Sequence, residues 1–114
     1  MAKRRMMSVE VGTSDEFNLL TKSAQALYLQ LNLSADDDGI VDKWKTILRS
    51  TRTKREHLDA LIDSGYVLML DDGSVLISDW LIHNRIRRDR YTESRHSTQL
   101  DSVYVSGTGR YFKA

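Results

Sequence analysis

The sequence predicts an α+β domain, and within that class a winged helix-turn-helix with a three-helix core and a β-hairpin wing. Three observations lead to this prediction. Apolar residues recur at helical spacing in two short segments that follow each other closely, residues 43–50 and 54–64. Two apolar strands around an Asp-Gly turn come next, within residues 66–78, and a short apolar pair precedes both helices. Strand, helix, helix and hairpin in this order are typical of a winged helix.

The length of the chain limits it to one hydrophobic core. With 114 residues, of which 40% are apolar, one domain with tails is expected. Ser, Thr and Gly accumulate after residue 95, and the apolar periodicity fades there. We therefore expect the winged-helix domain over residues 1–95 and a loosely structured C-terminal tail over residues 96–114.

The absence of cysteine excludes disulfides, thiolate metal sites and a cysteine nucleophile, and it favours a reducing cytoplasm. The longest apolar runs are strand-sized, far below the roughly 20 residues that a membrane span needs. A secretory signal would require a continuous apolar stretch after the basic start of the chain, and no such stretch follows it. These features predict a cytoplasmic protein that does not bind a membrane.

The N-terminal third predicts an extended segment and two helices. Residues 6–11 suit an extended conformation, and Ser14 with the two acids after it is typical of the start of a short helix that runs to about residue 20. A longer amphipathic helix is expected from residue 21 or 23 to about residue 33. Its apolar stripe consists of Ala24, Leu27, Tyr28 and Leu31.

The middle of the chain predicts the paired helices. Residues 36–39 read Asp-Asp-Asp-Gly, which favours a turn, and the Ile40-Val41 pair suits a short strand. Trp44 and the apolar residues three and four positions later predict the first helix, over about residues 43–50. Thr53 and Glu56 fit a capping box that starts the second helix, over about residues 54–64.

The clearest local pattern is a β-hairpin. Residues 66–70 and 75–78 are expected to form two mainly apolar strands, and Asp-Asp-Gly-Ser separates them. Residues 80–82 are expected to extend the second strand. The Arg-rich segment that follows, to about Arg95, suits either a helix or an extended segment.

Positive and negative charges segregate along the chain, although the net charge is only +1. Residues 43–55 contain basic residues and no acid, whereas residues 56–82 contain six acids and no Lys or Arg. Further basic clusters lie at residues 3–5 and 85–95. A molecule with this bipolar distribution has a basic side that attracts a polyanion such as DNA.

The predicted fold assigns roles to the basic residues. The second helix of a winged helix-turn-helix enters the major groove of double-stranded DNA, because its width matches that of the groove. The residues expected near base edges are Thr53, Lys54, Arg55 and His57, with Ala60 and Ser64 on the same outward face. The residues expected at phosphates are Lys43, Lys45, Arg49 and Arg52, supported by Arg85, Arg87, Arg88 and Arg90. The acidic wing tip, Asp71-Asp72, is expected to be repelled by DNA.

Other chemistry has little support in the sequence. Residues 36–39 lack the later ligands of a calcium loop, and the three histidines stand without acids at ligand spacing. Residues 107–110 are too short and too terminal for a phosphate loop. Both tryptophans, Trp44 and Trp80, suit packing better than base stacking. We therefore expect no cofactor, no metal and no catalytic activity.

Four motifs occur together in this order: MAKRRM at residues 1–6, SAQALY at 23–28, ADDDG at 35–39 and HNRIRRDRY at 83–91. Over residues 1–91 the chain thereby resembles the N-terminal domain of phage replisome organisers of low-GC Gram-positive hosts, which are relatives of DnaD-type primosomal proteins. The resemblance implies a winged helix, binding to the phage replication origin, recruitment of host helicase-loading proteins and self-association, for instance as a homodimer. Such proteins continue into a second region that contacts the host machinery, so recruitment is expected through regions absent here.

Two other functions fit the same pattern. A transcriptional regulator can have the same fold, because architecture does not decide function. A winged-helix module can also bind a protein instead of DNA, through its apolar hairpin or its acidic face.

Overall fold

Helix α3 (Lys22–Ser34) forms the centre of the molecule. The computed structural model describes residues 5–84 and 91–113, and in it the apolar stripe of α3 is completely buried. The hydroxyl of Thr21 caps the helix by accepting the backbone N–H of Ala24, at 3.1 Å. Helices α4 (Trp44–Thr51) and α5 (Arg55–Asp63) pack against α3. The sequence prediction of these three helices is confirmed.

A small antiparallel sheet completes the core. Its strands are β1 (Ile40–Val41), β2 (Val67–Met69) and β3 (Val75–Ile77), in the order β1-β3-β2. Leu76 of the central strand lies opposite both Ile40 and Leu68. All three residues of β3 are fully buried, which explains why this strand is apolar without alternation. The α+β class and the predicted hairpin are confirmed.

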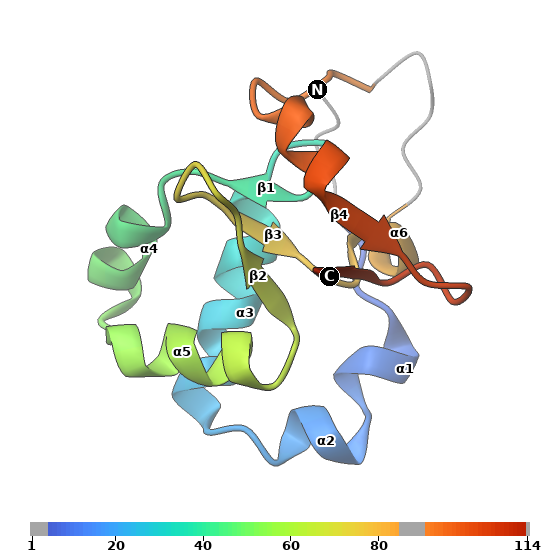
Figure 1. Cartoon of the computed structure of the whole chain (residues 1–114). Coiled ribbons are helices and arrows are strands. Elements are labelled where there is room, and N and C mark those ends of the chain that lie inside the picture. The colour runs from blue at the N-terminus through green and yellow to red at the C-terminus, as the bar shows by residue number, and fades with distance from the viewer. Residues whose placement is uncertain (1–4, 85–90, 114) are drawn as a thin grey trace.

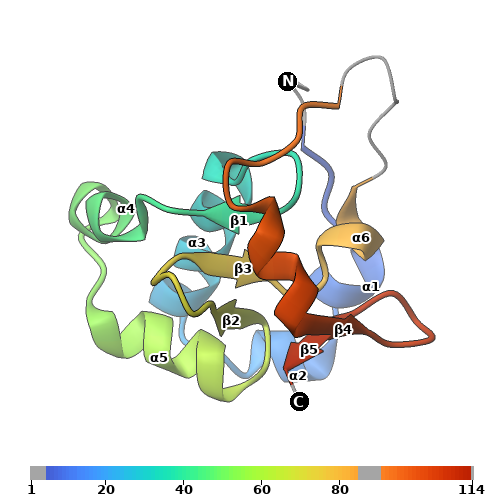
Figure 2. The same ribbon diagram turned by 45° about the horizontal axis from the view of Figure 1, so that its top comes forward.

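Helices α4 and α5 together form one side of the molecule. Figures 1 and 2 show α4 and α5 together at one edge, with the sheet between them and α6. No other element of the described chain lies outside the pair in either view. The outward surface of α4 and α5 is therefore open.

Two predicted extended segments are helical, and these predictions were wrong. Residues 9–12 form α1 (Val9–Gly12), because the Ser8 hydroxyl accepts the backbone N–H of Val11 and caps a turn there. The neighbouring α2 (Asp15–Asn18), capped by Ser14, was expected. Residues 80–83 form α6 (Trp80–His83) instead of extending β3. The chain leaves the sheet there because the Trp80 side chain turns into the core, where its indole donates to the carbonyl of Asp37 at 3.0 Å.

The C-terminal residues differ from the loosely structured tail expected over residues 96–114. Residues 97–113 contain a 3-10 helix, η1 (Ser97–Ser102), and a hairpin of β4 (Val103–Val105) and β5 (Tyr111–Lys113). Val103 and Tyr111 are buried in the main core. The backbone N–H of Tyr111 also donates to the carbonyl of Ser78, at 2.8 Å. Two apolar side chains and one backbone contact thus attach a segment whose composition suggested a tail.

Within residues 5–84 and 91–113, every helix is too short or too polar to cross a lipid bilayer.

Candidate nucleic-acid interface

The first cluster of basic residues predicted to contact DNA, residues 43–55, lies directly before α4, on α4, on the turn that follows it and at the start of α5. Lys45 and Arg49 are one helical turn apart, so they project from the same side of α4. The exposed members of the set are Lys43, Lys45, Arg49, Arg52, Lys54 and Arg55, while Thr53 and His57 are half-buried.

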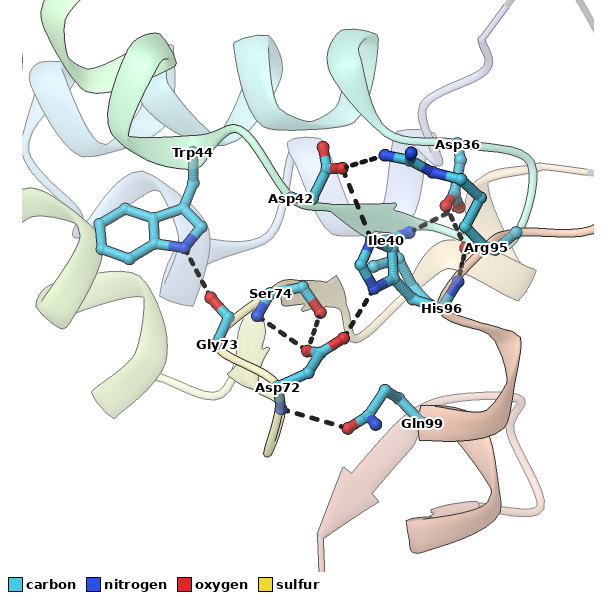
Figure 3. Close-up of polar contacts among 11 residues, drawn as sticks. Asp36, Ile40, Asp42, Trp44, Asp72, Gly73, Ser74, Arg95, His96 and Gln99 are labelled. Carbon is cyan, nitrogen blue, oxygen red and sulfur yellow. Dashed lines mark hydrogen bonds and ion pairs between the residues drawn. The ribbon is translucent and has the colours of Figure 1, made fainter.

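The indole of Trp44 joins the two helices electrostatically. The Lys45 Nζ lies 5.5 Å and the Arg55 guanidinium carbon 5.0 Å from the ring centroid, both within reach of a cation–π interaction. The ring itself is held in place, because its Nε1 donates to the carbonyl of Gly73 at the hairpin tip, at 2.8 Å (Figure 3). Trp44 is buried, as predicted, but its ring also lies beneath the cationic groups of Lys45 on α4 and Arg55 on α5.

Arg55 has a second partner on its own helix. Its Nε donates to the Asp59 Oδ1 at 2.9 Å, across one helical turn, and the two side chains are 55% and 51% exposed. The i, i+4 spacing of an arginine and an acid is visible in the sequence, yet sequence reasoning did not assign Asp59 a role. The contact orients the guanidinium in a position that remains accessible to solvent.

Arg52 lies at the sharp turn between the helices. Its φ is +57°, in the left-handed region. Among the residues that the structure describes, no other non-glycine residue has a positive φ. The turn is closed by backbone hydrogen bonds from Arg52 to Arg49, at 3.2 Å, and from Thr53 to Leu48, at 3.0 Å. The side chain of Arg52 is therefore presented outward, at the cost of backbone strain.

Two variants that remove the same charge are expected to differ in stability. R52G should be more stable than R52A by about 0.5–1 kcal/mol, because glycine relieves a left-handed strain of about 1–2 kcal/mol and loses about 0.5–1 kcal/mol to unfolded-state entropy. Urea denaturation of both variants measures the difference. Equal stability would show that the turn relaxes when the arginine side chain is removed.

The start of α5 corrects the predicted capping box of Thr53 and Glu56. The N-cap is Lys54, one residue later than expected, and its backbone N–H is accepted by the His57 Nδ1 at 3.0 Å. The Thr53 hydroxyl pairs instead with that of Thr51, at 2.8 Å. Two of the four side chains expected near base edges, those of Thr53 and His57, thus form local hydrogen bonds. His57 keeps only its Nε2 for another partner.

The hairpin tip is attached to the C-terminal segment. Figure 3 shows His96 between two acids: its Nδ1 lies 2.7 Å from the Asp72 carboxylate and its Nε2 lies 3.5 Å from that of Asp42. The Gln99 side chain accepts the backbone N–H of Asp72 at 3.3 Å. The acidic tip therefore meets partners within the chain, which sequence patterns did not indicate.

Local hydrogen bonds set the charge of both acids around His96. Hydrogen bonds from Ser74 lower the pKa of Asp72, and His96 lowers it further. Burial alone would raise the pKa of Asp42, but hydrogen bonds from His96 and Arg95 outweigh it, so the pKa lies below its usual value. Both acids therefore stay ionised at neutral pH.

The acids that follow α3 anchor the chain internally. Arg5 forms an ion pair with Asp37, at 3.2 Å, and its guanidinium lies 5.2 Å from the Trp80 ring centroid. Asp38 accepts the Tyr91 hydroxyl at 2.7 Å and the backbone N–H of Ser94 at 2.9 Å. Arg5, from the N-terminal basic cluster, thus serves the fold and does not belong to the basic surface of α4 and α5.

The second basic cluster is only partly described. Arg85, Arg87, Arg88 and Arg90 lie outside the described residues. Arg95, which follows them, has an 84% exposed side chain that reaches Asp42, at 3.0 Å, directly before Lys43 and α4 (Figure 3). The described end of this cluster therefore lies beside the start of α4.

Comparisons of the chain with protein-family models, with curated proteins and with solved structures found no match.

Proposed function

We propose that the chain is a winged helix-turn-helix that binds double-stranded DNA through α4 and α5. One observation carries this proposal: Lys45 and Arg55, from two different helices, converge on the Trp44 ring, beside the exposed basic turn at Arg52. Cationic groups that converge on an open surface are the electrostatic footprint of a nucleic-acid-binding protein.

The order of the elements supports the winged-helix assignment. Helix α3, strand β1, helices α4 and α5, and the hairpin β2–β3 follow each other as in that motif, and β1 pairs with β3 in the antiparallel sheet. In this assignment α5 is the helix that enters the major groove, while α4 and the turn after it contact phosphates. The hairpin tip has a smaller role, because Asp72 is engaged by the C-terminal segment.

For the biological role we propose initiation of phage DNA replication in the cytoplasm of the bacterial host. The support is the resemblance of residues 1–91 to the N-terminal domain of replisome organisers. Sequencing of the DNA fragments that the protein selects tests this role. Repeated sites clustered within a replication gene are expected, whereas single promoter sites would indicate a transcriptional regulator.

DNA binding itself is tested by its salt dependence. The logarithm of the association constant should fall linearly with the logarithm of the salt concentration, because each neutralised phosphate releases counterions. R49A should reduce the magnitude of that slope by about 1, as expected for the loss of one phosphate contact. Fluorescence anisotropy with a labelled duplex measures both slopes.

The matched control is R49K, which keeps the charge and should keep the slope. Circular dichroism at each salt concentration verifies that the variants are folded. Binding that does not depend on salt, or no binding at low salt, would contradict the proposal.

A protein-interaction module is the second candidate function, and the C-terminal hairpin favours it. Tyr104 and Phe112 stack there with ring centroids 5.6 Å apart, and both are about half exposed, as is Val105. The apolar hairpin β2–β3, by contrast, contributes β3 to the core and offers no such surface. A stable complex with a protein in a pull-down, together with the absence of any DNA mobility shift, would select this function.

A further inference from the structure

The side chain of Arg55 is fixed on two sides before any ligand binds. Its guanidinium lies over the Trp44 ring, and its Nε is bonded to Asp59. Trp44 is in turn anchored to the Gly73 carbonyl, so the platform beneath the guanidinium is rigid. An arginine held in this way loses less conformational entropy on binding than a solvated one.

The contact with Asp59 leaves the end of the guanidinium available. Only the Nε of Arg55 donates a hydrogen bond within the described part of the chain, so the two terminal nitrogens keep their donors. The side chain is 55% exposed, and Arg55 is the first residue of α5. In a helix that enters the major groove, the residues of the first turn are those that reach base edges.

We infer that Arg55 reads a guanine in the major groove and that Asp59 is its positioning residue. This inference rests on the proposed function. The two terminal nitrogens of a guanidinium match the O6 and N7 acceptors of guanine, a pairing that no other base offers in the same geometry. A side chain without hydrogen-bond donors cannot make this contact, and arginine makes it with a planar fork that is preorganised for two parallel hydrogen bonds. An exposed ion pair within one helix contributes little to stability, which leaves orientation as the stronger role for Asp59.

The test uses the full chain and chemically modified DNA. A duplex selected from a random library is resynthesised with each guanine replaced in turn by 7-deazaguanine, which lacks the N7 acceptor and keeps Watson–Crick pairing. For the unmodified protein we expect a loss of affinity on the order of 10-fold at one guanine, because one of the paired hydrogen bonds is removed. R55M, which keeps an apolar stem but has no hydrogen-bond donor, should still bind the duplex at low salt but lose this discrimination.

The role of Asp59 is tested by the discrimination against 7-deazaguanine, because a purely electrostatic effect of Asp59 would not change this discrimination. D59A removes an acid from the surface and should bind unmodified duplexes at least as tightly as the unmodified protein, yet its discrimination against 7-deazaguanine should fall several-fold. D63A removes the same charge one turn further along α5 and should keep the discrimination. If D59A and D63A behave alike, Asp59 does not position Arg55.

The outcomes separate the inference from the proposed function. Salt-dependent binding with the same 7-deazaguanine effect in R55M would overturn the assignment of Arg55 and leave DNA binding intact. Binding that 7-deazaguanine does not weaken at any position would also overturn the assignment of Arg55 and leave DNA binding intact. No binding to any duplex would overturn both.

Discussion

Replacement of Gly39 by alanine is expected to lower the free energy of unfolding by about 1.5–4 kcal/mol. The residue has a φ of +84°, and a Cβ there would lie 2.4 Å from the Trp80 Cγ and 2.7 Å from its Cβ. Part of the loss, about 0.5–1 kcal/mol, is the cost of the left-handed backbone less the unfolded-state entropy that alanine saves. The remainder, about 1–3 kcal/mol, is the cost of displacing a buried indole that is packed against the turn. Urea denaturation measures the change.

Gly73 provides the matched control for Gly39. Its φ of +87° is nearly the same, but a Cβ at this position would have no atom within 4 Å. G73A should therefore cost only the left-handed strain less the unfolded-state entropy that alanine saves, a net loss of about 0.5–1 kcal/mol. Equal losses in G39A and G73A would show that Trp80 moves aside without cost, contrary to the packing described above.

Acidification is expected to destabilise the protein through His83. Burial lowers the pKa of His83 from its ordinary value of 6.5 to about 4. Its Nδ1 accepts the backbone N–H of Ser8 at 2.8 Å, so the ring proton lies on Nε2, which is 2.6 Å from the Tyr28 hydroxyl. Protonation of Nδ1 would remove an acceptor and place a charge in the core.

The direction of the effect follows from the two pKa values. Because His83 binds a proton more weakly in the folded state than in the unfolded state, its contribution is fully present above about pH 6.5. The contribution is lost as the pH falls from 6.5 to about 4, and the loss amounts to about 3 kcal/mol. Chemical denaturation at a series of pH values measures it.

The variant H83Q separates the contribution of His83 to the pH dependence of stability from that of the other titrating groups. Glutamine can accept from Ser8 and donate to Tyr28 but does not titrate, so the difference between the two proteins should shrink as the pH falls from 7 to 4.5. If H83Q fails to fold, the ring resonances of His83 in the unmodified protein give the pKa directly by NMR titration. A pKa near 6.5 in the folded protein would contradict the prediction.

Local sequence patterns were sufficient where neighbouring residues decide the structure. The stripe of α3, the hairpin and the positions of α4 and α5 follow from apolar periodicity and turn chemistry, which act within a few residues. The exposure of Arg49 and Arg55 follows from the same periodicity, because the core faces of α4 and α5 are apolar. The segment of residues 80–83 was misjudged, because the burial of Trp80 turns the chain there and no local pattern records it.

For the candidate interface too, one part could be predicted from the sequence and another part could not. A run of basic residues without an acid identifies the surface, since charge is a property of the chain itself. The positions of Lys45 and Arg55 over Trp44 depend on how α4 and α5 both pack against α3, and the anchor of that ring at Gly73 joins residues 29 positions apart. His96 between Asp42 and Asp72 is likewise a contact between distant segments.

The sequence by itself determined the helices, the hairpin and the location of the positive charge, because these depend on spacing along the chain. Only the tertiary structure decided that His96 and Gln99 bind the hairpin tip, that Gly39 touches Trp80 and that Arg55 is fixed by two partners. Contacts of this kind arise from the packing of side chains in three dimensions, which distant parts of the chain determine together.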